Sequence, residues 1–112
     1  MGYKMLINFE KCPDFMELEL RQALYAALNR QSIVDNVFRG AGSVGSAGYV
    51  PEGSVFFNEN CVKYDYDPAA AKAAFEGKGF SITMLIADGD ADVNIAEIVK
   101  NDLVAAGIEV EV

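Results

Sequence analysis

The longest helical pattern in the chain covers residues 20–38, and the rest of the chain must pack around it. Its apolar side chains recur every three or four positions, which places them on one helix face: Leu20, Ala23, Leu24, Ala27, Leu28, Val34, Val37 and Phe38. The pattern is interrupted at Asn29, and asparagine is a good helix N-cap because its side chain accepts a hydrogen bond from a free backbone N–H. We therefore expect two helices in tandem, one ending near Leu28 and a shorter one that starts after Asn29 and ends at Gly40.

Three segments have the composition of β-strands. Residues 3–9 contain a continuous apolar run, which is typical of a strand covered on both faces. Residues 81–87 are rich in apolar and β-branched side chains, and their length favours a strand over a helix. Residues 108–112 alternate apolar and acidic side chains, the pattern of a strand with one covered face.

Two further helices are expected between these strands. Asp67 is an N-cap residue and Pro68 follows at the first helical position, where its missing N–H costs nothing. This helix extends through Phe75. The next helix has its apolar side chains on one face and ends at Gly107: Ile95, Ile98, Val99, Leu103 and Ala106.

The resulting order is strand, helices, loop, helix, strand, helix, strand. Strands separated by helices imply parallel pairing, so we predict a layered α/β domain of three strands with the βααβ-type arrangement. Ligands of open α/β sheets usually meet the carboxyl ends of the strands. The loops after Asn8 and Ala87 are therefore expected near any cleft.

The composition limits the function classes. A chain of 112 residues suits one domain, 1–112, and its 52% hydrophobic content argues against disorder. A net charge of −8 makes binding to nucleic acid or anionic membranes unfavourable. Histidine is absent, which removes the usual catalytic triads, and Cys12 and Cys61 form no C-x-x-C motif. The first residues lack the long apolar region of a signal peptide.

No cofactor or metal motif is present. Residues 40–53 contain five glycines and are expected to form a long loop, but they lack the pattern of a nucleotide-binding loop. Residues 88–92 begin like an EF-hand, yet Val93 and Val99 occupy the positions that need glycine and glutamate. We interpret this acidic run as a turn in which Asp90 or Asp92 caps the following helix.

Three stretches, in this order, resemble the family 5 extracellular solute-binding proteins. The first matches that family's V-R-Q-A-L-x-Y-A-I-D-R-x-x-I-V segment, with Asn29 where the family usually has aspartate. The second resembles Y-D-P-x-x-A-K-x-L-L-x-x-A-G-F, and the third resembles A-E-x-I-Q-x-D-L-x-x-x-G-I-x-V-x. The matching residues are Leu20–Leu24, Ala26–Arg30 and Ile33–Asp35, then Tyr66–Pro68, Ala71–Lys72 and Gly79–Phe80, then Ala96–Ile98, Asp102–Leu103 and Gly107–Val110.

The resemblance implies a part of lobe II of a type II periplasmic binding protein. Such a protein is not an enzyme. It closes two lobes around a solute, most often a peptide, and is recognised by an ABC permease. The intact protein would be periplasmic or otherwise extracytoplasmic and associated with the membrane. An isolated lobe is expected to expose an apolar patch or a free strand edge, which favours a homodimer.

The same resemblance suggests Asn8, Ser43, Ser46 and Tyr49 as ligand-binding residues. Asn8 ends the first predicted strand, where an asparagine that caps a turn is the alternative interpretation. The other three residues belong to the glycine-rich loop, for which an ordinary surface loop is the alternative. Asn29, Asp67, Pro68 and Gly107 are expected to be structural caps. A free-standing α/β regulatory or protein-interaction domain is the alternative function, and an enzyme is the third.

Overall fold

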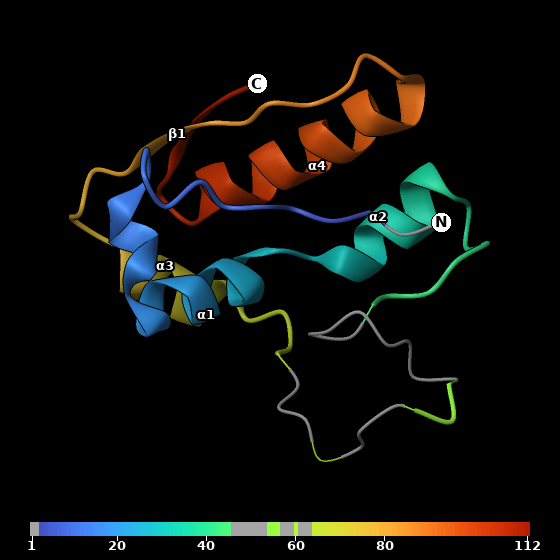
Figure 1. Ribbon diagram of the computed structural model, residues 1–112, viewed down its shortest axis with the longest axis horizontal. Helices are drawn as coiled ribbons and strands as arrows, with labels where there is room; N and C mark the ends of the chain where they lie inside the picture. The colour runs from blue at the N-terminus through green and yellow to red at the C-terminus, as the bar shows by residue number, and fades with distance from the viewer. Residues whose placement is uncertain (1–2, 46–53, 57–59, 61–63) are drawn as a thin grey trace.

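The structure is a computed structural model that describes residues 3–45, 54–56, 60 and 64–112. Its elements are, in chain order, the 3₁₀ helix η1 (Pro13–Met16), the helices α1 (Leu18–Ala27), α2 (Arg30–Val37) and α3 (Pro68–Phe75), then β1 (Ser81–Thr83), α4 (Asp90–Ala105) and β2 (Glu109–Glu111). In Figure 1, α1 and α3 lie side by side at one end of the molecule and α2 lies toward the other end. The longest helix, α4, extends along the molecule between these two ends.

The two strands form a parallel pair joined by α4. Ile82 lies opposite Val110 in the register, and Ser81 lies opposite Glu109. The hydrogen bonding continues past the strand ends, because Met84 N–H donates to the Glu111 carbonyl oxygen at 2.7 Å. The predicted parallel pairing of the segments before and after the last helix is therefore confirmed, in a βαβ unit.

The predicted first strand, residues 3–9, is wrong, and the structure shows two strands instead of the three-strand layout. Among the described residues only β1 and β2 pair. Leu6 is 83% exposed, although the apolar run around it predicted cover on both faces. A strand forms only where its backbone groups bond to a second strand, and no described strand pairs with residues 3–9. The strand predicted for residues 81–87 is also shorter than expected, because β1 covers only Ser81–Thr83.

The core lies where α1, α3, α4 and the start of β2 meet. Three aromatic rings, Phe15, Phe75 and Phe80, are packed within 6.3 Å of one another, measured between ring centres. The least exposed large side chains are Phe75, Leu103 and Ile108. The remaining buried members of this cluster are Leu20, Ala23, Leu24, Ala27, Ala71, Val99 and Ala106. The apolar faces predicted for the first and last helices are thus the faces that form the core.

Four predicted helix caps are confirmed. The Asn29 side chain accepts a hydrogen bond from Ser32 N–H at 3.1 Å, and Asp67 accepts one from Ala70 N–H at 3.1 Å. Pro68 is the first residue of α3. After α4, Gly107 has a φ of +95°, a conformation that favours glycine.

The end of α4 is a Schellman motif. Ile108 N–H donates to the Leu103 carbonyl and Gly107 N–H donates to the Val104 carbonyl, each at 3.0 Å. Since Leu103 and Ile108 are both buried, this turn leads directly from α4 into β2 through the core.

The predicted cap at the start of α4 is wrong. Gly89 occupies the N-cap position, with no side-chain hydrogen bond, while Asp90 and Asp92 lie in the first turn. Both carboxylates still oppose the positive end of the helix. Gly40, after α2, has the expected left-handed conformation, with a φ of +79°. Within the described part of the chain, no helix has the length and apolarity needed to cross a membrane.

Candidate functional site

Arg30, the first residue of α2, joins two parts of the backbone that are far apart in sequence. Its Nη1 donates to the Gly45 carbonyl oxygen at 3.1 Å, and its Nη2 donates to the Tyr64 carbonyl oxygen at 2.7 Å. The guanidinium carbon also lies 5.4 Å from the centre of the Tyr25 ring, within the range of a cation–π contact. We call Tyr25, Arg30, Gly45 and Tyr64 the Arg30 junction.

Tyr64 takes part in the Arg30 junction through both its ring and its backbone. Its ring stacks on the Tyr25 ring, with centres 5.0 Å apart and planes 26° apart. Three residues later, Asp67 N–H donates to the Ala26 carbonyl oxygen at 2.8 Å. The chain that leads into α3 is therefore held along the end of α1.

The gap between α1 and α2 is fixed by Asn29 and α4. While the Asn29 side chain caps α2, its backbone N–H donates to Asp102 Oδ2 at 2.9 Å. Asp102 lies on α4 and is half-buried. Arg30 thus starts from a backbone position that is held by a neighbouring helix.

Asn8, a predicted ligand residue, caps a turn. Its Oδ1 accepts hydrogen bonds from the backbone N–H groups of Glu10 and Lys11 at 3.1 and 3.3 Å. Its carbonyl oxygen accepts from Cys12 N–H, just before η1. The turn-capping interpretation is the one observed, and it occupies the amide oxygen.

The structure does not bring the loops after Asn8 and Ala87 together. The chain passes from Tyr3, next to Phe38 at the end of α2, to Phe15, which stacks on Phe80 just before β1. Figure 1 shows this blue segment running against the direction of β1. The turn at Asn8 leads into η1, whose Phe15 contacts Phe80 just before β1, whereas Ala87 follows the carboxyl end of β1.

Of the predicted loop residues, only Ser43 is described. It is exposed and lies two residues before Gly45 of the Arg30 junction. Ser46 and Tyr49 lie outside the described residues. Their predicted contacts with a solute remain predictions.

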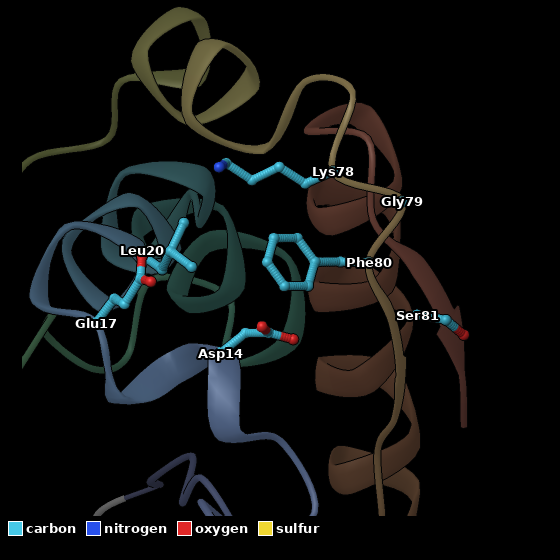
Figure 2. A pocket seen from close by; sticks show the side chains of 7 residues that line it. All are labelled: Asp14, Glu17, Leu20, Lys78, Gly79, Phe80 and Ser81. Carbon is cyan, nitrogen blue, oxygen red and sulfur yellow. The ribbon is translucent and has the colours of Figure 1, made fainter.

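A pocket of about 370 Å³ lies between η1, α1 and the turn before β1. Its lining residues are Asp14, Glu17, Leu20, Lys78, Gly79, Phe80 and Ser81. Figure 2 shows the Phe80 ring pointing into it, Lys78 above the ring and Asp14 below, while Ser81 points away. This pocket adjoins the amino end of β1, opposite to the carboxyl ends where open parallel sheets bind ligands. We therefore do not assign the solute to it.

The described residues contain no group of three or more cysteine, aspartate or glutamate side chains arranged to hold a metal ion. Asp90 and Asp92 belong to the first turn of α4 and are explained by the helix dipole.

Sequence reasoning placed Arg30 within a family segment but assigned it no role. Its partners lie 15 and 34 residues away, so no local pattern reveals them. An arginine at the first position of a helix, in a chain with a glycine-rich stretch from residue 40 onward, is the signal that was available.

The family model described as "Bacterial extracellular solute-binding proteins, family 5 Middle" matches residues 2–112. The chain is 35% identical over 107 residues to di/tripeptide-binding protein 1 of Pseudomonas aeruginosa, which covers 88% of this chain and 20% of that protein. It is 30% identical to the dipeptide-binding protein of Escherichia coli K12 over 100% of this chain and 22% of that protein. The chain spans about a fifth of the length of these curated relatives.

Solved structures show the same fold. The oligopeptide-binding protein AppA of Bacillus subtilis, in complex with a nonapeptide, matches with a TM-score of 0.74 and 31% identity, over 91% of this chain and 24% of that chain. AgaA of A. tumefaciens R10, in complex with agropinic acid, matches with a TM-score of 0.74 and 26% identity, over 90% of this chain and 22% of that chain. These similarities confirm a mixed α/β fold of the periplasmic-binding-protein kind.

Proposed function

The chain belongs to the bacterial extracellular solute-binding proteins of family 5, and from this premise we propose that it is part of the peptide-binding component of an ABC importer. The observation that carries the proposal is the match over residues 2–112, together with relatives named for dipeptides and tripeptides. A structural neighbour bound to a nonapeptide supports the same solute class.

In this proposal residues 1–112 form a single domain within lobe II. The intact protein closes two lobes around the peptide by a hinge motion, and an ABC permease recognises the closed form. It acts outside the cytoplasm, in the periplasm or at the membrane surface. Within the intact protein this domain contributes part of the contacts to the solute, and the protein catalyses no reaction.

The test is a calorimetric titration with trialanine of two proteins, the full-length gene product and the 112-residue chain. The full-length protein should bind, whereas the chain alone should give no measurable heat because half of the contacts are absent. Micromolar binding by the chain alone would contradict the lobe assignment. Absence of binding by both, for trialanine and for a panel of dipeptides and longer peptides, would favour the free-standing regulatory domain.

We also propose that the 112-residue chain on its own forms a homodimer. It exposes large apolar side chains near the free edge of the sheet, among them Leu85 at 97% and Val112 at 49%. An exposed apolar patch beside an unpaired strand edge favours association. Sedimentation equilibrium at high concentration should show a dimer, and a strictly monomeric profile would contradict this.

A further inference from the structure

We propose that the pocket between η1, α1 and the turn before β1 binds a small zwitterion whose ammonium and carboxylate groups are separated by several bonds. Its walls carry opposite charges, with Lys78 on one side of the Phe80 ring and Asp14 on the other (Figure 2). Its volume of about 370 Å³ lies in the range of small-molecule pockets. The inference goes beyond the proposed function and does not rest on it, because this pocket is not the site assigned to the transported solute.

The charged groups of the pocket are free to meet a ligand. The side chains of Asp14, Glu17 and Lys78 are exposed and have no hydrogen-bond or ion-pair partner among the described residues. Lys78 and the two carboxylates therefore do not neutralise one another across the pocket. A ligand ammonium at the carboxylates and a ligand carboxylate at Lys78 would each form charge-assisted hydrogen bonds.

The apolar surface of the pocket is the half-buried Phe80 ring, which is fixed by its neighbours. It stacks on the Phe15 ring, with centres 5.9 Å apart and planes 20° apart. It meets the Phe75 ring edge-on at 5.4 Å, and the Phe80 carbonyl oxygen accepts a hydrogen bond from Glu109 N–H at 2.9 Å. The part of the ring that faces the pocket lies between the opposite charges, so the apolar atoms of a ligand would pack on it.

The position of this ring determines the ligand class. Lys78 and Asp14 lie on opposite sides of the ring, so a ligand that reaches both must hold its charges apart. In a free α-amino acid the two charged groups share one carbon, whereas an ω-amino acid or a short peptide separates them. Since the pocket has two carboxylates and one ammonium, the ligand ammonium is the more strongly held end.

The acidic wall of the pocket is held by Arg21. Its Nη1 donates to the Phe15 and Met16 carbonyl oxygens at 3.0 and 2.8 Å. These two residues lie between Asp14 and Glu17 in the chain, and Glu17 N–H donates to the Asp14 carbonyl oxygen at 3.2 Å. The backbone positions that carry the two carboxylates are therefore fixed before a ligand binds.

The basic wall is a tight turn. Lys78 lies between Gly77 and Gly79, whose φ values of +73° and +64° favour glycine. Lys78 N–H donates to the Phe75 carbonyl oxygen at 3.2 Å. A site whose backbone is already in place loses less free energy to ordering when it binds.

The test follows the amide signals of Lys78, Phe80 and Ser81 in ¹⁵N–¹H spectra of the full-length protein. Titration with ε-aminocaproate should shift these signals until they saturate. Glycine has both charges on one carbon, and hexanoate and hexylamine carry one charge each. Each of these three controls should bind at least about threefold more weakly, the effect of losing one exposed ion pair.

A peptide titration distinguishes the two sources of such a ligand. Tighter binding of glycylleucine than of ε-aminocaproate at the same signals assigns the pocket to short peptides, and the reverse order assigns it to ω-amino acids. Both orders support the zwitterion site. Equal binding of ε-aminocaproate and glycine would overturn it.

Matched variants locate the site. Lys78→Met should weaken binding of ε-aminocaproate about threefold, while Lys72→Met, on exposed α3 surface outside the pocket, should leave it unchanged. Glu17→Gln should also weaken binding about threefold, while Glu19→Gln, two residues further on and outside the pocket, should leave it unchanged. Equal effects within either pair would contradict the inference.

A second measurement is independent of the variants. A ligand that binds only the folded protein raises the midpoint of thermal unfolding, so ε-aminocaproate should raise it more than glycine does at the same concentration. The absence of saturable shifts in the full-length protein, or an equal rise of the midpoint with both ligands, would overturn the inference. Failure of the full-length protein to bind trialanine would defeat the proposed function and leave this test unaffected.

Discussion

The turn from α4 into β2 and the segment at residues 3–9 are both rich in apolar side chains, but only the first buries them. Leu103 and Ile108 are 0% and 1% exposed, whereas Leu6 is 83% exposed and Met5 is 43% exposed. The first pair belongs to the core cluster, whereas within residues 3–9 only Ile7 packs against that cluster, and it is only partly buried. An apolar run thus shows that a segment needs cover, but only a neighbouring element provides it.

The strongest test of this difference compares Leu103→Ala with Leu85→Ala, the same chemical change at 0% and 97% exposure. Leu103→Ala should lower the free energy of unfolding of the chain by about 2–5 kcal/mol, because it leaves a cavity. Leu85→Ala should change it by about 0.5 kcal/mol or less. Urea denaturation followed by circular dichroism measures both.

Equal costs for the two leucine variants would break the comparison. Repeating the pair in the full-length protein sharpens it. If lobe II covers Leu85 there, Leu85→Ala becomes costly while the effect of Leu103→Ala stays the same.

A medium effect is expected at the turn itself. Gly107→Ala places a Cβ at a φ of +95° and should cost about 1–2 kcal/mol of stability. The control is Gly42→Ala, in the surface segment after α2, where an added Cβ meets nothing within 4 Å and no positive φ is required. Thermal unfolding should show a lower midpoint for the first variant and no loss for the second. A loss at Gly42 would mean that this segment is as tightly constrained as the turn.

The smallest effect concerns the start of α3, whose Ala71 and Phe75 belong to the core. Asp67→Ala removes the cap on Ala70 N–H and should cost about 1 kcal/mol. Asp65→Ala, two residues earlier in the same acidic run and outside any helix, should cost about 0.5 kcal/mol or less. The urea midpoints of the two variants give the difference. Similar midpoints would show that burial of Phe75, and not capping, sets where α3 begins.

The features that could be predicted from the sequence are those whose hydrogen bonds join residues only a few positions apart in the chain. The Asn29 cap reaches Ser32, the Asp67 cap reaches Ala70, and the Gly107 turn returns to Leu103. At α4 the same reasoning chose the wrong residue, because several acidic side chains compete there and the backbone at Gly89 begins the helix without any of them.

The features that sequence did not predict depend on distant partners. Residues 3–9 have the composition of a strand but lack a second strand among the described residues. Asn8 is predicted as a solute contact, but its amide oxygen accepts hydrogen bonds from the backbone N–H groups of Glu10 and Lys11. Arg30 has partners at separations of 15 and 34 residues, which a helical pattern does not encode.

The hydrogen bond from Asn29 N–H to Asp102 has a consequence for synthesis. The acceptor is 73 residues further along the chain, so the ribosome makes the gap between α1 and α2 long before it makes the group that closes it. Until α4 emerges, this backbone donor depends on water, and the angle between the two helices is unfixed. The first helices to be made are thus among the last to be fixed relative to each other. A nascent chain that stops before Asp102 lacks the hydrogen bond that fixes the orientation of α1 and α2.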